Sequence, residues 1–243
     1  MMNGLIALVG SGEYLPVMDE VDRYLLANCG AQGRPPRVVC LPTAAGEEGE
    51  RSWGRWMKMG EEHFIRLGAE VQSLRIIDRV SAEDVQYEPI LEAADLIYFS
   101  GGDPNYLYQT MDGSRAWVAA GKAWERGAVY AGCSAGAMIL GRSMPDFKKA
   151  GFGNIPGFGI VPFRFILPHF DAIPIVRQPL VFALERQMQE GESLLGVDEE
   201  TALVGRLGGD WHVHGSQSVS IISRKDKQVY RKGQAVDLSS SQP

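Results

Sequence analysis

Excess positive charge and long apolar runs are both missing from this sequence of 243 residues. The 24 basic residues against 30 acidic ones give a net charge of −6, which leaves no electrostatic footprint for nucleic acid or an anionic membrane. The longest apolar runs are about as long as a strand, so no segment is predicted to span a bilayer. The first residues, MMNGLIALVG, have no Lys or Arg before their short apolar run. They are therefore typical of a first β-strand and not of a signal peptide.

Cysteine is also scarce, with Cys29, Cys40 and Cys133 far apart and no C-x-x-C spacing among them. An odd number of scattered cysteines favours neither a disulfide framework nor a zinc site. A reducing compartment follows, so we expect a cytoplasmic protein without a structural metal.

What the chain does contain is an alternation of short apolar runs with longer helical patterns. Strands are predicted at 5–10, 37–43, 69–77, 95–103 and 128–132, and helices at 16–29, 48–67, 81–94 and 114–127. This order indicates an α/β fold with a mostly parallel sheet and crossover helices. From about residue 194 onward, successive strand-like pieces predict hairpins at one edge of that sheet. The simplest organisation is one domain over 1–238, with 239–243 as a disordered tail.

Two adjacent residues in the turn after the fifth strand, Cys133 and Ser134, are candidate nucleophiles. The frame G-x-S-x-G fits Ser134, with Gly132 and Gly136 two positions before and after it. The same frame around Cys133 would need glycines where Ala131 and Ala135 stand. A nucleophile elbow needs small residues at those positions because its backbone is strained. The frame therefore favours Ser134, with Cys133 packing beneath the turn as a small apolar residue.

A second loop at the same edge of the sheet is Ser100-Gly101-Gly102-Asp103-Pro104, which follows the fourth strand. Its two glycines allow a turn with exposed backbone amides. One of these amides, together with that of Ala135, is suited to stabilise an oxyanion. A turn chosen only for its dihedral angles is the alternative.

A serine nucleophile needs a base, and four histidines are available: His63, His169, His212 and His214. His169 follows the apolar run RFILP, so it lies at the end of a predicted strand where it can meet Ser134. His212 and His214 lie on one face of a predicted strand, but no third metal ligand accompanies them.

The acid that orients the histidine is not determined by spacing. Candidates are Asp146, Asp171, Asp198, Glu199 and Glu200, any of which could approach the second imidazole nitrogen. The first loop, GSGEYL at 10–15, matches a dinucleotide fingerprint only at Gly10 and Gly12, since Leu15 stands where the third glycine belongs. We therefore expect no cofactor.

Taken in order, FSGGDPNYL, GCSAGAMI, PHF and LLGVDEETALV resemble the cyanophycinase and aspartyl dipeptidase (peptidase E) family of serine peptidases. The resemblance runs from LIALVGSGE to HVHGSQSVSII and so covers most of the chain. The Gly-Gly-Asp loop and the GVDEETALV run are more similar to the cyanophycinase-like branch.

The resemblance implies a flavodoxin-like fold related to class I glutamine amidotransferases, with helices on both faces of the sheet. It implies Ser134 as nucleophile and His169 as base, with the backbone amides of Gly102 and Asp103 in the oxyanion hole. It places the acid at Asp146, between the Ser and the His, although MPDFKKAG departs from the cyanophycinase pattern there. Glu199 is the second choice.

The substrate that the resemblance implies is a small peptide with a peptide or isopeptide bond involving aspartate. An acidic substrate group needs a cationic partner, for which Arg142, Arg164 and Arg177 are the candidates, each more often an ordinary surface ion pair. A non-catalytic amidotransferase-like module that binds a ligand is the alternative function. The oligomeric state is left open, a homodimer included.

Overall fold

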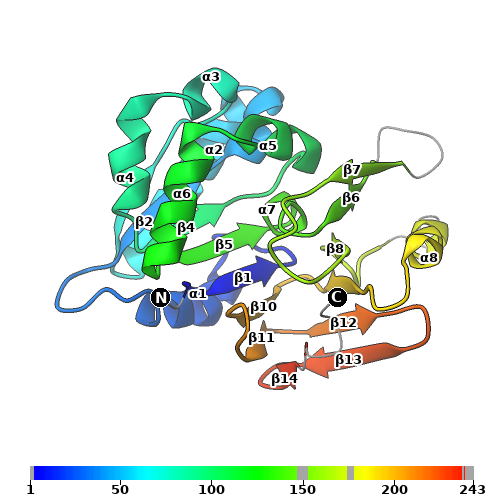
Figure 1. Ribbon diagram of the computed structural model, residues 1–243. Coiled ribbons are helices and arrows are strands. Elements are labelled where there is room, and N and C mark those ends of the chain that lie inside the picture. The colour runs from blue at the N-terminus through cyan, green and yellow to red at the C-terminus, as the bar shows by residue number, and fades with distance from the viewer. Residues whose placement is uncertain (1–2, 147–152, 174–177, 237, 239–243) are drawn as a thin grey trace.

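An eight-stranded sheet forms the centre of the computed structural model, which describes residues 3–146, 153–173, 178–236 and 238. Its strand order is β14-β11-β10-β1-β5-β4-β2-β3 (Figure 1). The strands of this main sheet are β1 (Ile6–Val9), β2 (Arg37–Leu41), β3 (Glu70–Ser73), β4 (Leu96–Phe99), β5 (Val129–Cys133), β10 (Thr201–Gly205), β11 (Trp211–Gly215) and β14 (Ala235–Val236). Strands β1 to β5 pair in parallel, while β10 pairs antiparallel with β1, β11 with β10 and β14 with β11.

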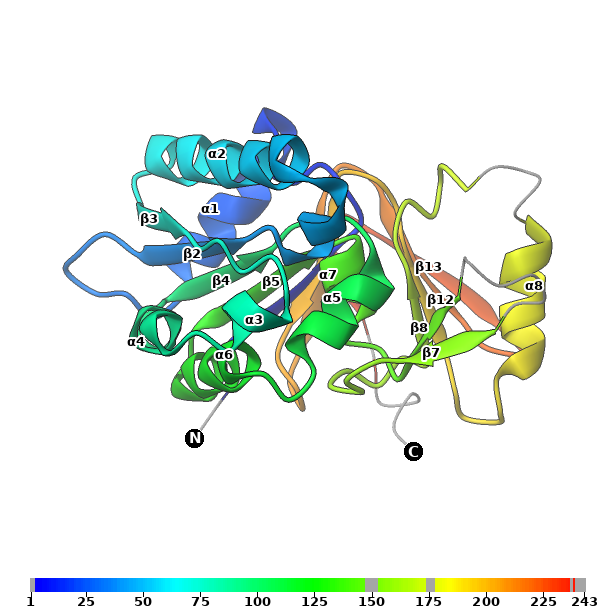
Figure 2. The same cartoon turned by 90° about the horizontal axis from the view of Figure 1, so that it is seen from above.

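Helices cover both faces of the main sheet, as Figure 2 shows from above. One face carries α1 (Asp19–Ala27) and α2 (Glu50–Arg66); on the other lie α3 (Arg79–Ala82), α4 (Glu88–Glu92), α5 (Pro104–Met111), α6 (Arg115–Arg126) and α7 (Ala135–Met138). Alternate residues of each strand point to opposite faces, so Ile6 and Leu8 enter one core while Ala7 and Val9 enter the other. The predicted α/β fold with a mostly parallel sheet is confirmed.

A second sheet, in the order β13-β12-β9-β8, lies beside the first. Its strands are β8 (Phe165–Leu167), β9 (Leu194–Val197), β12 (Ser218–Ile222) and β13 (Lys227–Arg231), and α8 (Gln178–Gln187) packs on it through Leu184. The prediction that the C-terminal strands all form hairpins at one edge is therefore wrong in part. Strands β10, β11 and β14 extend the main sheet, whereas β9, β12 and β13 pair with β8. A short hairpin, β6 (Ser143–Pro145) with β7 (Asn154–Pro156), completes the strands of the described chain.

Local signals determine which helices were predicted correctly. Helix α6, predicted at 114–127, begins after Ser114, whose side chain accepts from the Trp117 amide, and ends at Gly127 with φ 114°, both residues of the types that favour helix ends. The predicted helix at 81–94 is instead α3, the 3-10 turn Val85–Tyr87 and α4. The N-cap of α3 is Asp78, whose side chain accepts from the Ser81 amide, so Ser81 is the third residue of that helix.

Another segment is shorter than predicted. Strand β3 ends at Ser73 instead of residue 77. Further 3-10 turns span Pro16–Met18 and Thr43–Glu48. The predicted disordered tail, 239–243, lies outside the described residues. In the part of the chain that is described, no helix combines the length and apolarity needed to cross a bilayer.

Candidate active site

Three loops meet at the carboxyl edge of the parallel strands β1, β5 and β4. The pairing of Val9 with Cys133 and of Phe99 with Gly132 brings the ends of these strands level. A Cβ at position 101 would lie 3.3 Å from the Cβ of Ser134, so the Gly-Gly loop lies directly against the turn after β5. Ligands bind at this edge in open parallel sheets.

Ser134 forms the sharp turn between β5 and α7, with φ 50° and ψ −106°. A Cβ at position 132 would lie 2.3 Å from the Gly136 carbonyl oxygen, and one at position 136 would lie 2.7 Å from the Phe99 oxygen. Both flanking glycines are therefore needed for close backbone approach. Ser134 is half-buried, whereas Cys133 is fully buried, so the turn presents the hydroxyl and hides the thiol.

Cys133 has a polar partner that the sequence did not predict. Its thiol donates to Glu13 Oε2 at 3.0 Å. Burial, followed by the adjacent Glu13 carboxylate, raises the pKa of Cys133 well above the ordinary thiol value. The thiol is therefore neutral near pH 7, and a neutral buried thiol is a poor nucleophile.

The amides of the Gly-Gly loop differ in what they contact. Gly101 N donates to Glu13 Oε1 at 2.9 Å and Asp103 N donates to the Ala44 carbonyl at 2.9 Å. Because the Asp103 N–H already bonds to the Ala44 carbonyl, the structure does not favour the predicted role of that amide in the oxyanion hole. The Gly102 and Ala135 amides have no protein acceptor within the described ranges, which leaves these two to bind an oxyanion.

His169 follows β8 and also has a positive φ, 50°. Its Nδ1 lies 2.8 Å from Glu199 Oε1, and the two side chains are 44% and 42% exposed. Glu199 belongs to the turn between β9 and β10, where the chain passes from the second sheet to the main sheet. Because β10 pairs with β1, this turn lies at the carboxyl edge beside the first loop, and the Glu200 amide donates to Ser11 Oγ at 3.3 Å.

Asp171 holds the Glu199 turn in place. Its Oδ1 accepts from the Glu199 amide at 2.8 Å, and its Oδ2 accepts from Gln217 Nε2 at 2.8 Å. Partial burial works to raise the pKa of Asp171, but these hydrogen bonds outweigh it and the pKa lies below the ordinary value. Asp171 therefore supports Glu199 as a carboxylate rather than contacting the imidazole.

Asp146, the first-choice acid, lies elsewhere in the structure. It follows strand β6, and its amide donates to the Gly153 carbonyl at 2.7 Å across the β6–β7 hairpin. Asp198 also has another role, because its Oδ2 accepts from the Ser218 hydroxyl at 2.5 Å. The geometry thus favours Glu199, the second choice, over Asp146 as the partner of His169.

Ser134 and His169 are not hydrogen-bonded to each other in this structure. Their loops are linked through the first loop, where Ser11 contacts the Glu200 amide and Glu13 contacts Gly101. Hydrogen bonds between catalytic groups often shorten only when substrate binds. The site is therefore assembled from the two sheets, with Ser134 from the main sheet and His169 from the second.

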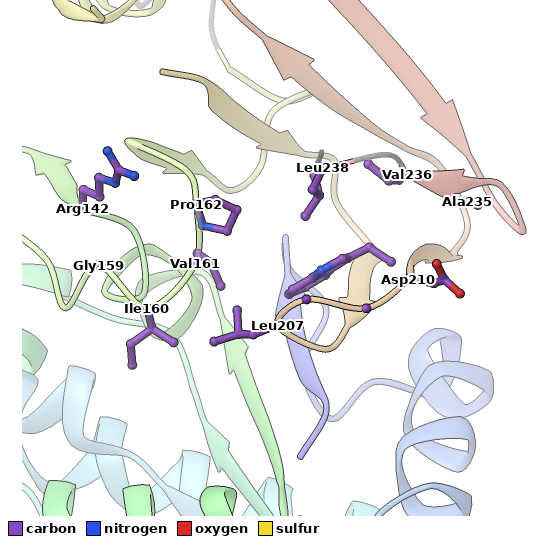
Figure 3. Close-up of a pocket in the computed structure, with 13 residues that line it drawn as sticks. Arg142, Gly159, Ile160, Val161, Pro162, Leu207, Asp210, Ala235, Val236 and Leu238 are labelled. Atoms are coloured by element: carbon purple, nitrogen blue, oxygen red, sulfur yellow. The ribbon is translucent and has the colours of Figure 1, made fainter. Parts of the chain in front are cut away.

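Two of the arginines predicted to bind substrate, Arg142 and Arg164, are not at this edge. Arg142 lines a cavity of about 620 Å³ whose opposite side is the β10–β11 turn with Asp210 (Figure 3). That turn follows Gly205, which pairs with Ile6 at the amino end of β1. Arg164 precedes β8 and pairs with Glu192 at 2.8 Å, at the end of the strand away from His169. Arg177 lies outside the described residues.

Glu13 was not predicted from the sequence as part of the site. An acid in the loop after the first strand of a parallel sheet was the available signal, because that loop faces the ligand-binding edge. Within the described residues no group of three or more His, Cys, Asp or Glu is arranged to hold a metal ion.

Comparison with known proteins relates the chain to peptidases. The family model described as Peptidase family S51 matches residues 6–209. A cyanophycinase from Synechococcus elongatus is 28% identical over 237 residues, 92% of this chain and 69% of that protein. A cyanophycinase from Nostoc sp. is 26% identical over 204 residues, 79% of this chain and 65% of that protein.

Solved structures agree with this relation. A crystal structure of a peptidase from an acI-B1 Actinobacterium is 35% identical with a TM-score of 0.86, covering 97% of each chain. A structure from Listeria monocytogenes that carries the name peptidase E is 19% identical with a TM-score of 0.57, covering 94% of this chain and 98% of its own. That second likeness concerns the fold alone.

Proposed function

Since the chain belongs to peptidase family S51 and is thus a hydrolase of peptide or isopeptide bonds, we propose that Ser134 is its nucleophile and that the bonds it cleaves involve aspartate. The observation that carries the first part is the strained, half-buried Ser134 turn at the same edge as the His169–Glu199 pair. The second part is supported by relatives named cyanophycinase, which match 92% of this chain.

The proposed reaction uses His169 as a general base and then as a general acid. With Nδ1–H donating to the Glu199 carboxylate, Nε2 keeps its lone pair and can accept the Ser134 proton. Ser134 Oγ then attacks the carbonyl carbon, and the Gly102 and Ala135 amides bind the oxyanion. His169 returns the proton to the leaving amine as the acyl-enzyme forms. Water activated by the same imidazole hydrolyses the ester and restores Ser134.

Replacement of Ser134 tests this mechanism. We expect Ser134→Ala to lower kcat by ~10⁴-fold or more, because the covalent step is lost while the oxyanion donors remain. The assay is hydrolysis of a panel of Asp-X and β-Asp-X dipeptides by wild type and variant. In parallel, a fluorophosphonate probe should label wild type at Ser134 and leave the variant unlabelled.

Cys133→Ala is the matched control, because it changes the neighbouring residue and leaves the hydroxyl. It should be labelled by the probe, although its rate can change through the contact with Glu13. Full activity in Ser134→Ala on a substrate that wild type cleaves would refute the serine mechanism. A folded wild-type protein that neither labels nor hydrolyses any dipeptide would instead favour a ligand-binding module.

A further inference from the structure

Glu13 is a buried acid that the proposed reaction does not use. It lies in the loop after β1, is 7% exposed, and reaches both of the other loops at the carboxyl edge. Its neighbours along the chain are fixed. Gly12 has φ 84° and Tyr14 has φ 64°, and the Tyr14 ring is buried among Phe64 and Tyr98. The carboxylate is therefore held in one position by the backbone on either side.

Each oxygen of the Glu13 carboxylate accepts one hydrogen bond. Oε1 accepts from the Gly101 amide at 2.9 Å, and Oε2 accepts from the Cys133 thiol at 3.0 Å. One donor immediately precedes Gly102 and the other immediately precedes Ser134. A buried carboxylate with both oxygens bonded is a rigid connection, since breaking either bond leaves a buried polar group without a partner.

The fit around this connection is close. A Cβ at position 101 would lie 2.9 Å from Glu13 Oε1 and 3.3 Å from the Ser134 Cβ. Only glycine leaves room there for the carboxylate and the serine together. At position 102 a Cβ would lie 2.4 Å from the Ala44 carbonyl, so the loop is confined on its other side as well. The direction of the Gly102 N–H therefore depends on the Gly101 peptide that Glu13 binds.

We propose that Glu13 is a positioning residue, whose carboxylate fixes the Gly101 peptide against the Ser134 turn so that the Gly102 amide and the Ser134 hydroxyl face the same reacting carbonyl. This inference rests on the proposed serine mechanism. Glu13 does not contact the substrate carbonyl; it acts through the two residues next to the groups that do. Misplacing a reacting group by about 1 Å costs ~10²-fold in rate, which sets the scale of the expected effect.

The test compares Glu13→Ala with Glu13→Gln. The alanine variant loses both acceptors, so we expect kcat on the dipeptide that wild type cleaves to fall about 10²-fold with KM nearly unchanged. The rate of fluorophosphonate labelling at Ser134 should fall in parallel. Glutamine keeps an oxygen for the Gly101 amide, so Glu13→Gln should recover kcat to within about tenfold of wild type.

Asp22→Asn is the control for lost stability. Asp22 is also buried, and its carboxylate bonds to His63 Nε2 at 2.8 Å instead of to the loops that Glu13 binds. It should change the melting temperature while kcat per folded molecule stays at the wild-type value. Should Glu13→Ala not fold, Glu13→Asp applies the same kinetic test, because it shortens the side chain and keeps its charge.

The proposal is overturned if Glu13→Ala, or Glu13→Asp in its place, keeps wild-type kcat. It is equally overturned if the loss only follows the folded fraction, or if Glu13→Gln is as inactive as Glu13→Ala. Activity in Ser134→Ala would be a separate failure, that of the serine mechanism itself. An inactive Ser134→Ala with a fully active Glu13→Ala would reject the positioning role alone.

Discussion

Several residues of the candidate site have a positive backbone φ although they are not glycine. Ser134 and His169 both have φ 50°, and Glu200, next to Glu199, has φ 53°. Such conformations cost free energy and persist where the surroundings enforce them, often at functional sites. Here the surroundings are the close-packed glycines 132 and 136 and the hydrogen bonds of the Glu199 turn.

Single substitutions can decide whether Glu199 or Asp146 is the acid that orients His169. We expect Glu199→Ala to lower kcat by ~10²–10⁴-fold, because the imidazole loses the group that fixes its tautomer and orientation. Asp146→Ala should lower kcat far less, since Glu199 bonds to the His169 imidazole, whereas Asp146 follows β6 and its amide bonds across the β6–β7 hairpin. The measurement is kcat on the cleaved dipeptide for both variants. An inactive Asp146→Ala with an active Glu199→Ala would reverse the assignment.

Residue patterns predicted the turn and the histidine, whereas Glu199 was only one of several candidate acids and Glu13 was not predicted at all. The G-x-S-x-G frame is local, so it can be recognised without knowing the fold. The contacts of Glu13 span 88 and 120 residues, and they exist only because β1 pairs with β5 and β5 pairs with β4. Glu199 reaches His169 because β9 pairs with β8, and no local sequence pattern indicates that pairing.

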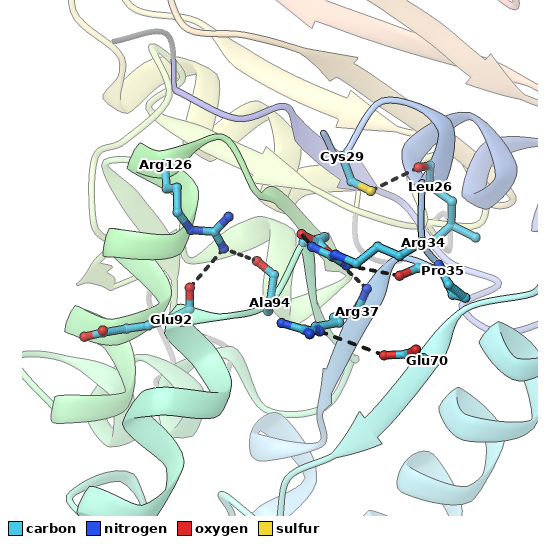
Figure 4. A network of polar contacts seen from close by, with 10 residues as sticks. Leu26, Cys29, Arg34, Pro35, Arg37, Glu70, Glu92, Ala94 and Arg126 are labelled. Atoms are coloured by element: carbon cyan, nitrogen blue, oxygen red, sulfur yellow. Dashed lines mark hydrogen bonds and ion pairs between the residues drawn. The ribbon is translucent and has the colours of Figure 1, made fainter. Parts of the chain in front are cut away.

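At the element scale, a polar cluster closes the end of β2 and β4 opposite the candidate site. Arg34 makes two hydrogen bonds to Asp95, at 2.6 and 2.9 Å, and the Arg37 amide makes a third at 2.8 Å. Figure 4 shows Arg34 and Arg37 together at this edge with Arg126. Asp95 immediately precedes β4, so the cluster fixes the start of that strand against the start of β2.

We expect Asp95→Asn to destabilise the fold in a pH-dependent way. Burial works to raise the pKa of Asp95, but hydrogen bonds from Arg34 and the Arg37 amide outweigh it and lower the pKa. A carboxyl with a lowered folded pKa stabilises above its unfolded pKa of about 4. That contribution is lost as the pH falls through the folded value. The variant should therefore melt about 5 °C lower at pH 7, with a smaller difference near pH 3.

The control for Asp95 is Glu70→Gln. The Glu70 carboxylate lies 3.9 Å from Arg37, and both side chains are more than half exposed, so removing the charge should leave the melting temperature nearly unchanged. Equal shifts for Asp95→Asn at both pH values would show that its charge is not the source of the stabilisation.

Helices whose ends are set by neighbouring residues could be predicted from the sequence. Helix α6, for example, has its capping residues directly at its two ends. The segment 81–94 has a helical pattern, but the Asp84 side chain bonds to the Gln86 amide and Pro89 lies in the first turn of the next helix. These local interruptions divide it into three short turns of helix.

Across the whole molecule, the second sheet determines the position of His169 through its contacts with the adjacent Phe170. Gly196 in β9 faces the Phe170 ring, and a Cβ there would lie 2.5 Å from the ring. Phe170 is adjacent to His169 and its amide donates to the Val197 carbonyl. The position of the imidazole therefore depends on packing within the second sheet.

We expect Gly196→Ala to lower kcat about tenfold, because the added methyl group must displace Phe170 and with it His169. The measurement is kcat together with the melting temperature. Gly121→Ala in α6 is the matched control, since no atom lies within 4 Å of its new Cβ. It should leave kcat unchanged and stabilise slightly. If Gly196→Ala keeps wild-type kcat, packing in this sheet does not govern the imidazole.

The division of the site between two sheets has a consequence for how function depends on folding. Ser134 lies in the turn after β5 of the main sheet. Its proposed base, His169, follows β8 of the second sheet and bonds to Glu199 in the turn at 198–200, where the chain passes back to the main sheet. A chain that had formed only the main sheet would have the Ser134 turn in place but no His169 imidazole beside it to accept the hydroxyl proton. Catalytic turnover is then a readout of assembly, appearing only after both sheets have come together.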